Sequence, residues 1–540
     1  MALVVLKLLQ NSLLIFVLGT FFSKPSLAAA KISDDMSLPP VPYPSENQPT
    51  EAKRVLGKIL FWDEQLSTDN SIACGTCHLP SANGADKRIG LEPGFDKIIN
   101  TSDDILGSLG VVSRDALGQV QNHSVFKQNP QVTNRTAQAY FSGIWADTNF
   151  WDGRASSEFI DPKTKKIVIS AGGALESQAL GPLMSNVEMA KDGQTADEII
   201  TKLKQAKPLA LATNLPADIQ AVLSDGSDYN TLFTKAFGDQ NISLKRIAFA
   251  LATYERSLVS NQTPWDLAMA KQQKLPYLEN LGWEFFQQSG CAQCHTPPLF
   301  TDNKFYNIGI QGINTDLGRK QLSLDSKDHG AMKVPSLRNT GLKLTYMHTG
   351  QFTSLEKVID VYANVPFEDM ATKMPNGEKY NFQFSEYQRK ALIAFLTFSL
   401  TDERVKNETF PFDRPKLRNE ISNTQSPQAI QNSAIGLNKK GLVEISWQQM
   451  QAELGFDVEI VRNDGRHYWA AQSPFEDIYT EFGESYEYQI FSRNGQLSLS
   501  EPAILNIKLA SDKSIYWLLT ALGLLLLTIV VYSKKMNKPN

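Results

Sequence analysis

Two copies of one five-residue motif constrain this chain more than any other feature. The 540-residue sequence contains four cysteines, and all four lie in the runs CGTCH at 74–78 and CAQCH at 291–295. A Cys-x-x-Cys-His run is the attachment signature of a c-type haem, in which two thiols bond the porphyrin and the histidine faces the iron. The sequence therefore predicts two covalently bound haem c groups.

A pair of structural disulfides or a single zinc site would also account for four cysteines. An exported chain with an even cysteine count commonly forms disulfides. Neither alternative explains why a histidine directly follows the second cysteine in both runs. The predicted haem-attachment residues are Cys74, Cys77, Cys291 and Cys294, and the predicted proximal iron ligands are His78 and His295.

Apolar runs near both ends predict export and membrane anchoring. Residues 8–22 are apolar and are followed by three alanines at 28–30, which is typical of a secretory signal peptide at 1–30. An uncleaved anchor is the alternative. Residues 515–532 are uncharged and long enough to span a bilayer, although a buried core helix would have a similar sequence.

Lysines at 534, 535 and 538 follow the second apolar run, so the positive-inside rule places the tail in the cytoplasm. The expected location is the periplasmic side of the inner membrane. The net charge is -4, and no basic block is present, so the sequence gives no reason to expect nucleic-acid binding.

The length and the periodicity predict several domains of different class. Helical spacing at 51–63, 242–258 and 386–400 indicates a mainly α protein, whereas Gly- and Asp-rich turns at 84–118 predict a loop around a haem edge. The expected divisions are an N-terminal haem domain at 50–240, a C-terminal haem domain at 241–415, a linker at 416–433, a β module at 434–510 and a transmembrane helix at 515–532.

The β module is predicted from alternating polar and apolar residues. Segments 442–447, 457–461 and 486–491 have period-two alternation, and turn sequences lie at 463–465 and 494–495. This pattern indicates a small all-β sandwich, similar to a fibronectin type III module. No titratable cluster lies on it, so we expect a spacer or docking role.

Further motifs give the haem-bearing region a specific resemblance. The chain resembles the bacterial di-haem cytochrome c peroxidase family, which also includes MauG, over roughly residues 50–415, with the motifs in family order. The runs that carry the resemblance are NRTA at 134–137, FWDGRA at 150–155, LESQALGP at 175–182, VEM at 187–189, YERSL at 254–258, PLFTD at 298–302, DLGR at 316–319, VPSLRN at 334–339 and YMHTG at 346–350.

The resemblance implies two cytochrome c-like domains and a reactive N-terminal haem. His78 would be its proximal ligand, and Gln178, Pro182 and Glu188 would form its distal set. Glu188 would move the proton that peroxide cleavage requires, although a carboxylate at a helix start is the alternative. Family members also use a loop histidine to cap this haem; the nearest candidate is His123, whose spacing fits poorly and suits a surface loop.

The C-terminal haem would transfer electrons. The resemblance places its second axial ligand at Tyr362, where methionine or tyrosine occurs in the family, and tyrosine favours oxidised iron. Tyr362 as a buried helix aromatic is the alternative, with Met347, Met370 or Met374 as substitute ligands. Trp151 matches the family's tryptophan between the haems, where an aromatic ring can help electrons cross. An ordinary core tryptophan is the alternative.

The resemblance also implies a calcium ion between the haems. Its ligands would be the Asn134 side chain and backbone carbonyls at Lys343 and Thr345. Oxygen ligands suit calcium, but the residues at the two carbonyl positions differ from the usual ones.

The expected function is reduction of hydrogen peroxide to water by a di-haem cytochrome c peroxidase. The electrons would come from a small periplasmic cytochrome c or cupredoxin, and a homodimer is expected by resemblance. One alternative is a MauG-like oxidase that uses peroxide to oxidise a protein or organic substrate. A second alternative is a non-catalytic electron-transfer cytochrome.

Overall fold

The structure is a computed structural model that describes most of residues 36–510. The described part has gaps at 99–102, 311–315, 365–383, 422–428, 440, 449–457, 464–466, 471–472, 478–479, 481–482 and 493–499. The predicted signal peptide and transmembrane helix lie outside the described residues. None of the helices in the described part combines the length and apolar character that a bilayer crossing requires.

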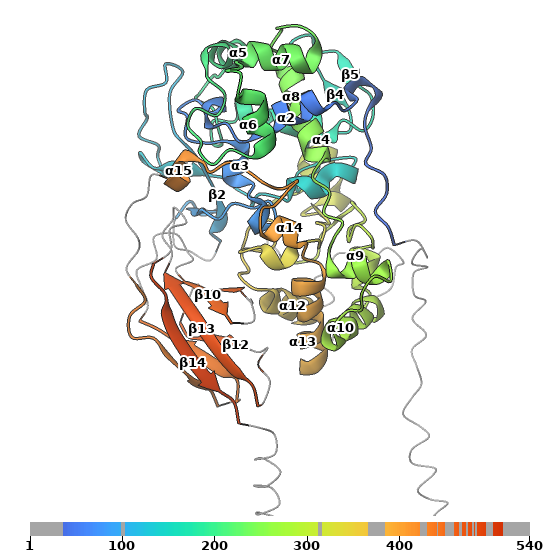
Figure 1. Cartoon of the computed structure of the whole chain (residues 1–540), viewed down its shortest axis with the longest axis vertical. Helices are drawn as coiled ribbons and strands as arrows, with labels where there is room; N and C mark the ends of the chain where they lie inside the picture. The colour runs from blue at the N-terminus through green and yellow to red at the C-terminus, as the bar shows by residue number, and fades with distance from the viewer. Residues whose placement is uncertain are drawn as a thin grey trace, which may run out of the picture.

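The first hydrophobic core lies in the upper half of Figure 1 and is built around two packed helices, α2 (Glu51–Phe61) and α8 (Leu244–Arg256). Thr50 and Ser243 cap their N-termini by accepting backbone N–H groups. The axes approach closely at Gly57, where a Cβ would lie 1.9 Å from the Ala250 carbonyl oxygen. Glycine is therefore required at this crossing.

The other elements of this region surround the two helices. They are η1 (Ser45–Asn47), η2 (Glu64–Leu66), α3 (Cys74–Cys77), η3 (Pro80–Ala82), β1 (Ile89–Glu92), β2 (Ile105–Val112), β3 (Pro130–Val132), η4 (Tyr140–Trp145), β4 (Phe159–Ile160), β5 (Ile167–Ile169), α4 (Ala174–Leu180), η5 (Pro182–Met184), α5 (Ala196–Gln205), α6 (Ala217–Leu223) and α7 (Tyr229–Phe237).

The segment expected to be a loop contains strands. β1, β2 and β3 form a three-stranded antiparallel sheet, with Ile89 opposite Ser108 in the first pair. Glycines inside β1 and β2 hid the strand pattern from the sequence. Gly107 and Gly110 lie where other backbone carbonyls approach within about 2 Å of a Cβ position, so these glycines serve close packing rather than a loop.

The second core follows Leu258 in the chain and lies below the first in Figure 1. It is formed largely by aromatic residues, among which Trp283, Phe300 and Phe395 contact one another. Its elements, with the two short helices after it, are α9 (Pro264–Met269), α10 (Tyr277–Gln288), η6 (Cys291–Gln293), β6 (Phe305–Tyr306), α11 (Lys320–Ser323), η7 (Ser326–Asp328), β7 (Met332–Lys333), η8 (Thr340–Leu342), α12 (Leu355–Asn364), α13 (Glu386–Ala394), the π-helical η9 (Phe395–Ser399), α14 (Glu403–Lys406) and α15 (Arg418–Ile421).

The cores divide the chain differently from the predicted boundary after residue 240. Helix α8 packs in the first core, and the chain returns to that core at Val405, Phe412 and Leu417. The physical reason is that α8 is buried on nearly all sides, so that it acts as the central helix of the first domain.

The C-terminal strands form a third core, which lies at the lower left of Figure 1. One sheet has the order β11-β10-β13-β14 and the other β12-β9-β8. The Asp477 carboxylate of β12 accepts hydrogen bonds from Arg462 and Tyr488 of the first sheet, both at 2.7 Å. The fibronectin-like interpretation stays a prediction. The strands are β8 (Ala434–Leu437), β9 (Val443–Ser446), β10 (Val458–Arg462), β11 (His467–Ala470), β12 (Phe475–Asp477), β13 (Ser485–Ser492) and β14 (Ala503–Lys508).

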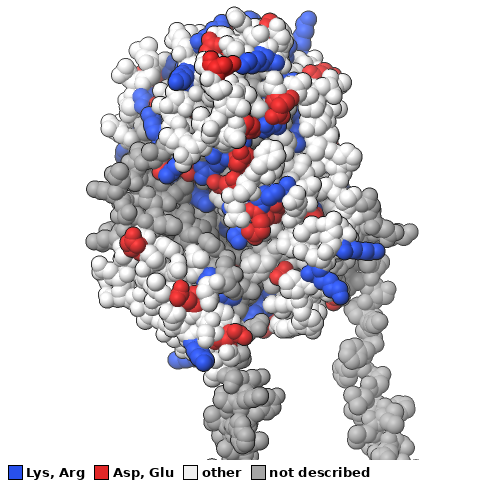
Figure 2. Space-filling view, viewed as in Figure 1, with Lys and Arg blue, Asp and Glu red and all other residues white. Residues whose placement is uncertain are grey.

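The face in Figure 2 carries acidic and basic side chains interspersed over its described surface. No broad area of one sign is visible on that face, consistent with the small net charge.

Candidate active site

The first Cys-x-x-Cys-His run lies at the edge of a cavity in the N-terminal region, here called the N-terminal cavity. Cys74, Cys77 and His78 line it. The His78 ring donates from Nδ1 to the carbonyls of Gly84 and Gln138, at 2.9 and 3.0 Å. This leaves Nε2 for an iron atom and fixes the ring orientation, as is usual for metal-ligating histidines. Burial lowers the pKa of His78, which favours the neutral ligand form.

The predicted distal residues line the same cavity. Gln178 comes from α4, Pro182 begins η5, and Glu188 follows that short helix. Burial raises the pKa of Glu188, while the positive charge of Arg154 acts against that rise. Arg154 also lines the cavity, lies over the Phe150 ring at 3.6 Å and pairs with Asp152 at 3.2 Å. A carboxyl group whose pKa is raised by burial suits proton transfer.

His123 does not line either cavity described here. Its Nδ1 accepts the backbone N–H groups of Val125 and Phe126, at 3.2 and 3.1 Å, and its ring stacks on Phe126. These contacts hold His123 in a local turn, the arrangement that suits a surface loop histidine.

The second run lines a separate cavity, here called the C-terminal cavity. Cys291, Cys294 and His295 lie on its wall. Nδ1 of His295 donates to the carbonyls of Pro335 and Phe300, at 3.1 and 3.3 Å, so this histidine also presents Nε2. The two histidines are therefore oriented in the same way, each by one carbonyl a few residues later in the chain and one from a distant segment.

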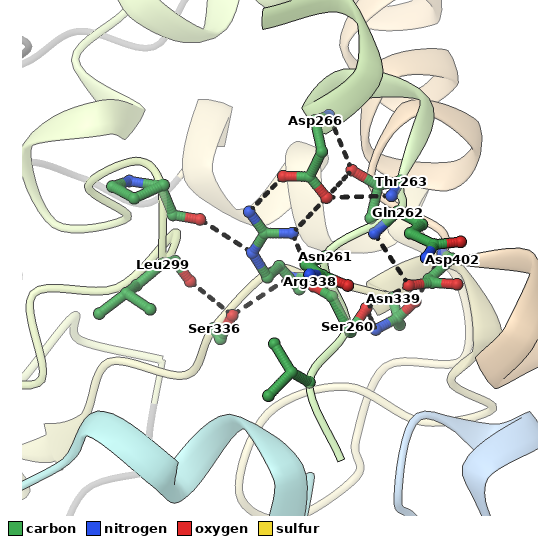
Figure 3. A network of polar contacts seen from close by, with 12 residues as sticks. Ser260, Asn261, Gln262, Thr263, Asp266, Leu299, Ser336, Arg338, Asn339 and Asp402 are labelled. Atoms are coloured by element: carbon green, nitrogen blue, oxygen red, sulfur yellow. Dashed lines mark hydrogen bonds and ion pairs between the residues drawn. The ribbon is translucent and has the colours of Figure 1, made fainter. Parts of the chain in front are cut away.

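A buried network behind His295 holds the loop that carries Pro335. The Arg338 guanidinium binds both carboxylate oxygens of Asp266, at 2.7 and 2.9 Å, and donates to the Pro298 carbonyl at 2.8 Å (Figure 3). Ser336 donates to the Leu299 carbonyl at 2.6 Å, which ties the loop to the segment after the haem motif. Bidentate pairing gives the loop a defined geometry.

The structure places two of the four candidates for the second axial ligand on the wall of this cavity. Tyr362 of α12 lines the cavity together with Met347, whereas Met370 and Met374 lie outside the described residues. Burial raises the pKa of Tyr362 far above its usual value, so the phenol is neutral unless a metal binds it. Tyrosine ligation stays a prediction.

One wall separates the two cavities. Gln138, Ala139, Asn149 and Trp151 line both of them. The Trp151 indole N–H donates to the Thr136 carbonyl at 2.9 Å, and its ring meets His348 edge-on with centroids 6.2 Å apart. Trp151 therefore lies where a group between two haems would lie.

The cavities fit two covalently attached haem groups. None of the four cysteines is in a disulfide, and the described residues contain no cluster of three or more His, Cys, Asp or Glu side chains suited to a metal ion. Burial holds the thiols protonated, raising the pKa of Cys74 to about 12. The buried Asn83 Oδ1 and Asn149 Nδ2 line the C-terminal cavity without a hydrogen-bond partner, which suits a polar group on its occupant.

The residues implied for calcium fit that ion poorly. Asn134 is exposed and lines the N-terminal cavity, Thr345 is buried, and Lys343 lines the C-terminal cavity. The Lys343 ammonium is itself a cation, and its partly buried position, which removes hydration, lowers its pKa to about 8. A calcium ion on the carbonyl of the same residue would be repelled by this charge.

Sequence reasoning missed Glu255 and Arg154 as residues of the N-terminal cavity. Both line the cavity that Glu188 lines. Burial raises the pKa of Glu255 to about 8, and its Oε2 has no hydrogen-bond partner in the described structure. Each residue belongs to a motif that carried the family resemblance. The motifs could therefore have pointed to these residues, but the sequence analysis gave neither residue a chemical role.

Comparison with known proteins agrees with this arrangement of two cavities. A family model described as di-haem cytochrome c peroxidase matches residues 51–274. The methylamine utilization protein MauG of Methylorubrum extorquens is 30% identical over 384 residues, which cover 70% of this chain and 84% of that protein. The cytochrome c551 peroxidase of Nitrosomonas europaea is 24% identical over 395 residues, covering 72% of this chain and 90% of that protein.

A fold with two Cys-x-x-Cys-His cavities that share a tryptophan wall defines a di-haem c-type oxidoreductase. The chain belongs to the di-haem cytochrome c peroxidase and MauG family. It is a peroxidase-type oxidoreductase, and the cofactors of its family are two haem c groups.

Proposed function

We propose that this protein reduces hydrogen peroxide to water in the N-terminal cavity. The supporting observation is that Gln178, Pro182 and Glu188 line the cavity into which His78 projects. The haem would supply the iron that binds peroxide and transfers electrons. Two electrons and two protons convert one peroxide into two waters, and Glu188 is positioned to move a proton between the two oxygens.

The electrons would enter at the C-terminal cavity, from a small periplasmic cytochrome c or cupredoxin. They would then pass the wall at Trp151, because this indole lines both cavities. Gln178 would orient peroxide by hydrogen bonding, and Pro182 would shape the cavity without adding an N–H donor.

The test is peroxide-dependent oxidation of a reduced c-type cytochrome by the haem-loaded full chain. We expect Glu188→Gln to lower the rate by about 10²- to 10⁴-fold, the usual contribution of a general acid or base. Glu46→Gln is the matched control, because Glu46 is an exposed carboxylate outside both cavities. No donor oxidation by the wild type would reject the peroxidase proposal, whereas full activity of Glu188→Gln would reject only the role of Glu188.

A MauG-like oxidase is the second candidate, in which peroxide drives oxidation of a protein or organic substrate. It is favoured by Tyr362 in the C-terminal cavity and by the position of His123 outside the N-terminal cavity. A low-temperature electron paramagnetic resonance spectrum of the oxidised protein distinguishes the candidates. This candidate predicts a high-spin signal before any reduction and a low-spin signal that Tyr362→Phe alters.

Other spectra would favour the remaining candidates. A reductively activated peroxidase predicts that the oxidised protein gives low-spin signals alone and that Tyr362→Phe does not change them. It also predicts that part of the signal becomes high-spin after half-reduction. Low-spin signals that persist throughout would favour a non-catalytic electron-transfer cytochrome. That last candidate gives no role to Glu188 or Gln178 in the cavity.

We also propose that the chain is exported and held at the periplasmic face of the inner membrane. The support is the pair of apolar runs at 8–22 and 515–532 in the sequence. Cell fractionation of the full chain and of a chain ending at residue 510 tests this proposal, since only the full chain should sediment with membranes. The homodimer and the docking role of the β module stay predictions.

A further inference from the structure

Lys343 lies where the two haem-bearing regions meet. Its neighbour Leu342 packs against the first core, while Tyr346, three residues later, belongs to the second core. Lys343 itself lines the C-terminal cavity. The side chain is therefore a positive group between the two sites.

This ammonium has no counter-charge among the described residues. No carboxylate of the described residues lies close enough to act on the charge of Lys343. Lys333, on the wall of the same cavity, differs because its Nζ donates to the Thr148 carbonyl at 2.6 Å and feels the charge of Asp147. The Lys343 side chain is partly buried and lines the cavity. A haem there would shield its ammonium from water, so an anionic group on that haem is the expected partner.

Another polar atom on the wall of the C-terminal cavity fits an anion of the carboxylate type. The buried Asn149 Nδ2 lines the same cavity and has no acceptor in the described structure. Together, Lys343 and Asn149 offer two kinds of donor, and a carboxylate accepts from both. A haem carries two carboxylates on its propionate arms, whereas its vinyl groups are bonded to the cysteines.

We propose that Lys343 binds a propionate carboxylate of the C-terminal haem from the wall of the C-terminal cavity, so that this region carries its cation as a side chain and requires no calcium ion. Asn149 completes the carboxylate site. The proposal rests on the proposed function only in requiring haem at His295.

The test combines metal analysis with spectroscopic redox titration of the haem-loaded full chain. After dialysis against a calcium chelator, the wild type should retain no stoichiometric calcium and keep its di-haem spectrum. Lys343→Met should lower the midpoint potential of the C-terminal haem, because the unpaired propionate charge stabilises ferric iron. Lys343→Arg should stay close to the wild type, since it keeps the charge and the donors.

Lys327→Met is the control, because it removes the same charge from an exposed position in η7. It should leave the potential unchanged. One tightly held calcium per wild-type chain would overturn the proposal, as would an unchanged potential in Lys343→Met. The calcium measurement needs no variant, so it can overturn the proposal even if Lys343→Met fails to fold. Failure of peroxide turnover would bear on the proposed function alone, because neither readout depends on activity.

Discussion

Trp151 donates its indole N–H to the carbonyl oxygen of Thr136 at 2.9 Å, which fixes the ring in the wall that both cavities share. Thr136 is in turn tied to the C-terminal region, because its N–H donates to the His348 carbonyl at 2.8 Å and its hydroxyl to the Met347 carbonyl at 3.0 Å. The position of the indole thus depends on segments from both haem-bearing regions.

Trp151→Phe should slow electron transfer between the haems. Phenylalanine fills less of the shared wall and loses the hydrogen bond to Thr136. We expect the reoxidation of the C-terminal haem by peroxide to slow by about tenfold, which corresponds to about 1.4 kcal/mol in the barrier. Stopped-flow absorption at the haem bands measures this rate.

The control for this change is Trp145→Phe. Trp145 donates its indole N–H toward the Pro39 and Pro40 carbonyls and lines neither cavity. An equal slowing in both variants would mean that Trp151 acts through general packing rather than through its place in the wall.

Arg154→Gln should shift the pH dependence of peroxide reduction. The Arg154 charge acts against the burial that raises the pKa of Glu188. Without that charge the pKa of Glu188 rises further, so the carboxylate form that accepts a proton appears only at higher pH. The acidic limb of the kcat/KM profile for peroxide should therefore move to higher pH.

Arg246→Gln provides a matched control for the Arg154 change. Arg246 also pairs with a carboxylate, Asp239, and lies over an aromatic ring, Phe237, but it lines neither cavity. Its profile should match the wild type. If the acidic limb of the Arg154→Gln profile does not move, Arg154 does not influence the ionisation of Glu188.

The sequence predicted the proximal ligands because the attachment motif encodes them locally. The family resemblance grouped Gln178, Pro182 and Glu188, which lie within a short span that folds as a helix, a 3-10 turn and the following residues. These residues meet at one cavity without requiring knowledge of distant contacts.

One partner of each histidine was beyond prediction, because it is a backbone carbonyl of a distant segment. Pro335 reaches His295 from 40 residues away in sequence, and Gln138 reaches His78 from 60. Backbone carbonyls have no residue-type signature. The raised pKa of Glu255 was also beyond prediction, because residues 254–256 have the sequence of an ordinary helix end. In the structure the neighbouring Arg256 pairs with the buried Glu176 at 2.6 Å and not with Glu255.

Asp266→Asn should destabilise the C-terminal haem region. It breaks the bidentate pair with Arg338, whose side chain is 5% exposed, and leaves a buried guanidinium without its carboxylate. Breaking a buried pair costs about 3 kcal/mol or more. Chemical denaturation followed by haem absorption should show this loss, and the His295 environment should change because Arg338 holds the loop that carries Pro335.

Asp239→Asn is the comparison for the Asp266 variant, since the Asp239 and Arg246 pair lies at the surface. Exposed pairs contribute little to stability. If Asp266→Asn unfolds at the same denaturant concentration as the wild type, the network in Figure 3 does not support the haem loop.

Glu255 should make the stability of the N-terminal haem region fall as pH rises. Burial raises the pKa of Glu255 from 4.5 to about 8. Below pH 4.5 the carboxyl is protonated in both the folded and the unfolded chain. Between these two values the unfolded chain ionises first, so the folded state loses relative stability until the pH passes the folded pKa.

Glu255→Gln removes this titration while keeping the size and shape of the side chain. The unfolding free energy of the variant, compared with that of the wild type, should therefore improve progressively from pH 4.5 to pH 8 and remain level above it. Denaturant titrations at several pH values measure the difference. Glu198→Gln is the control, because Glu198 lies at the surface, where capping and pairing lower its pKa, so its substitution should not reproduce this dependence. A difference between Glu255→Gln and wild type that is constant over this range would show that the Glu255 carboxyl ionises normally in the folded protein.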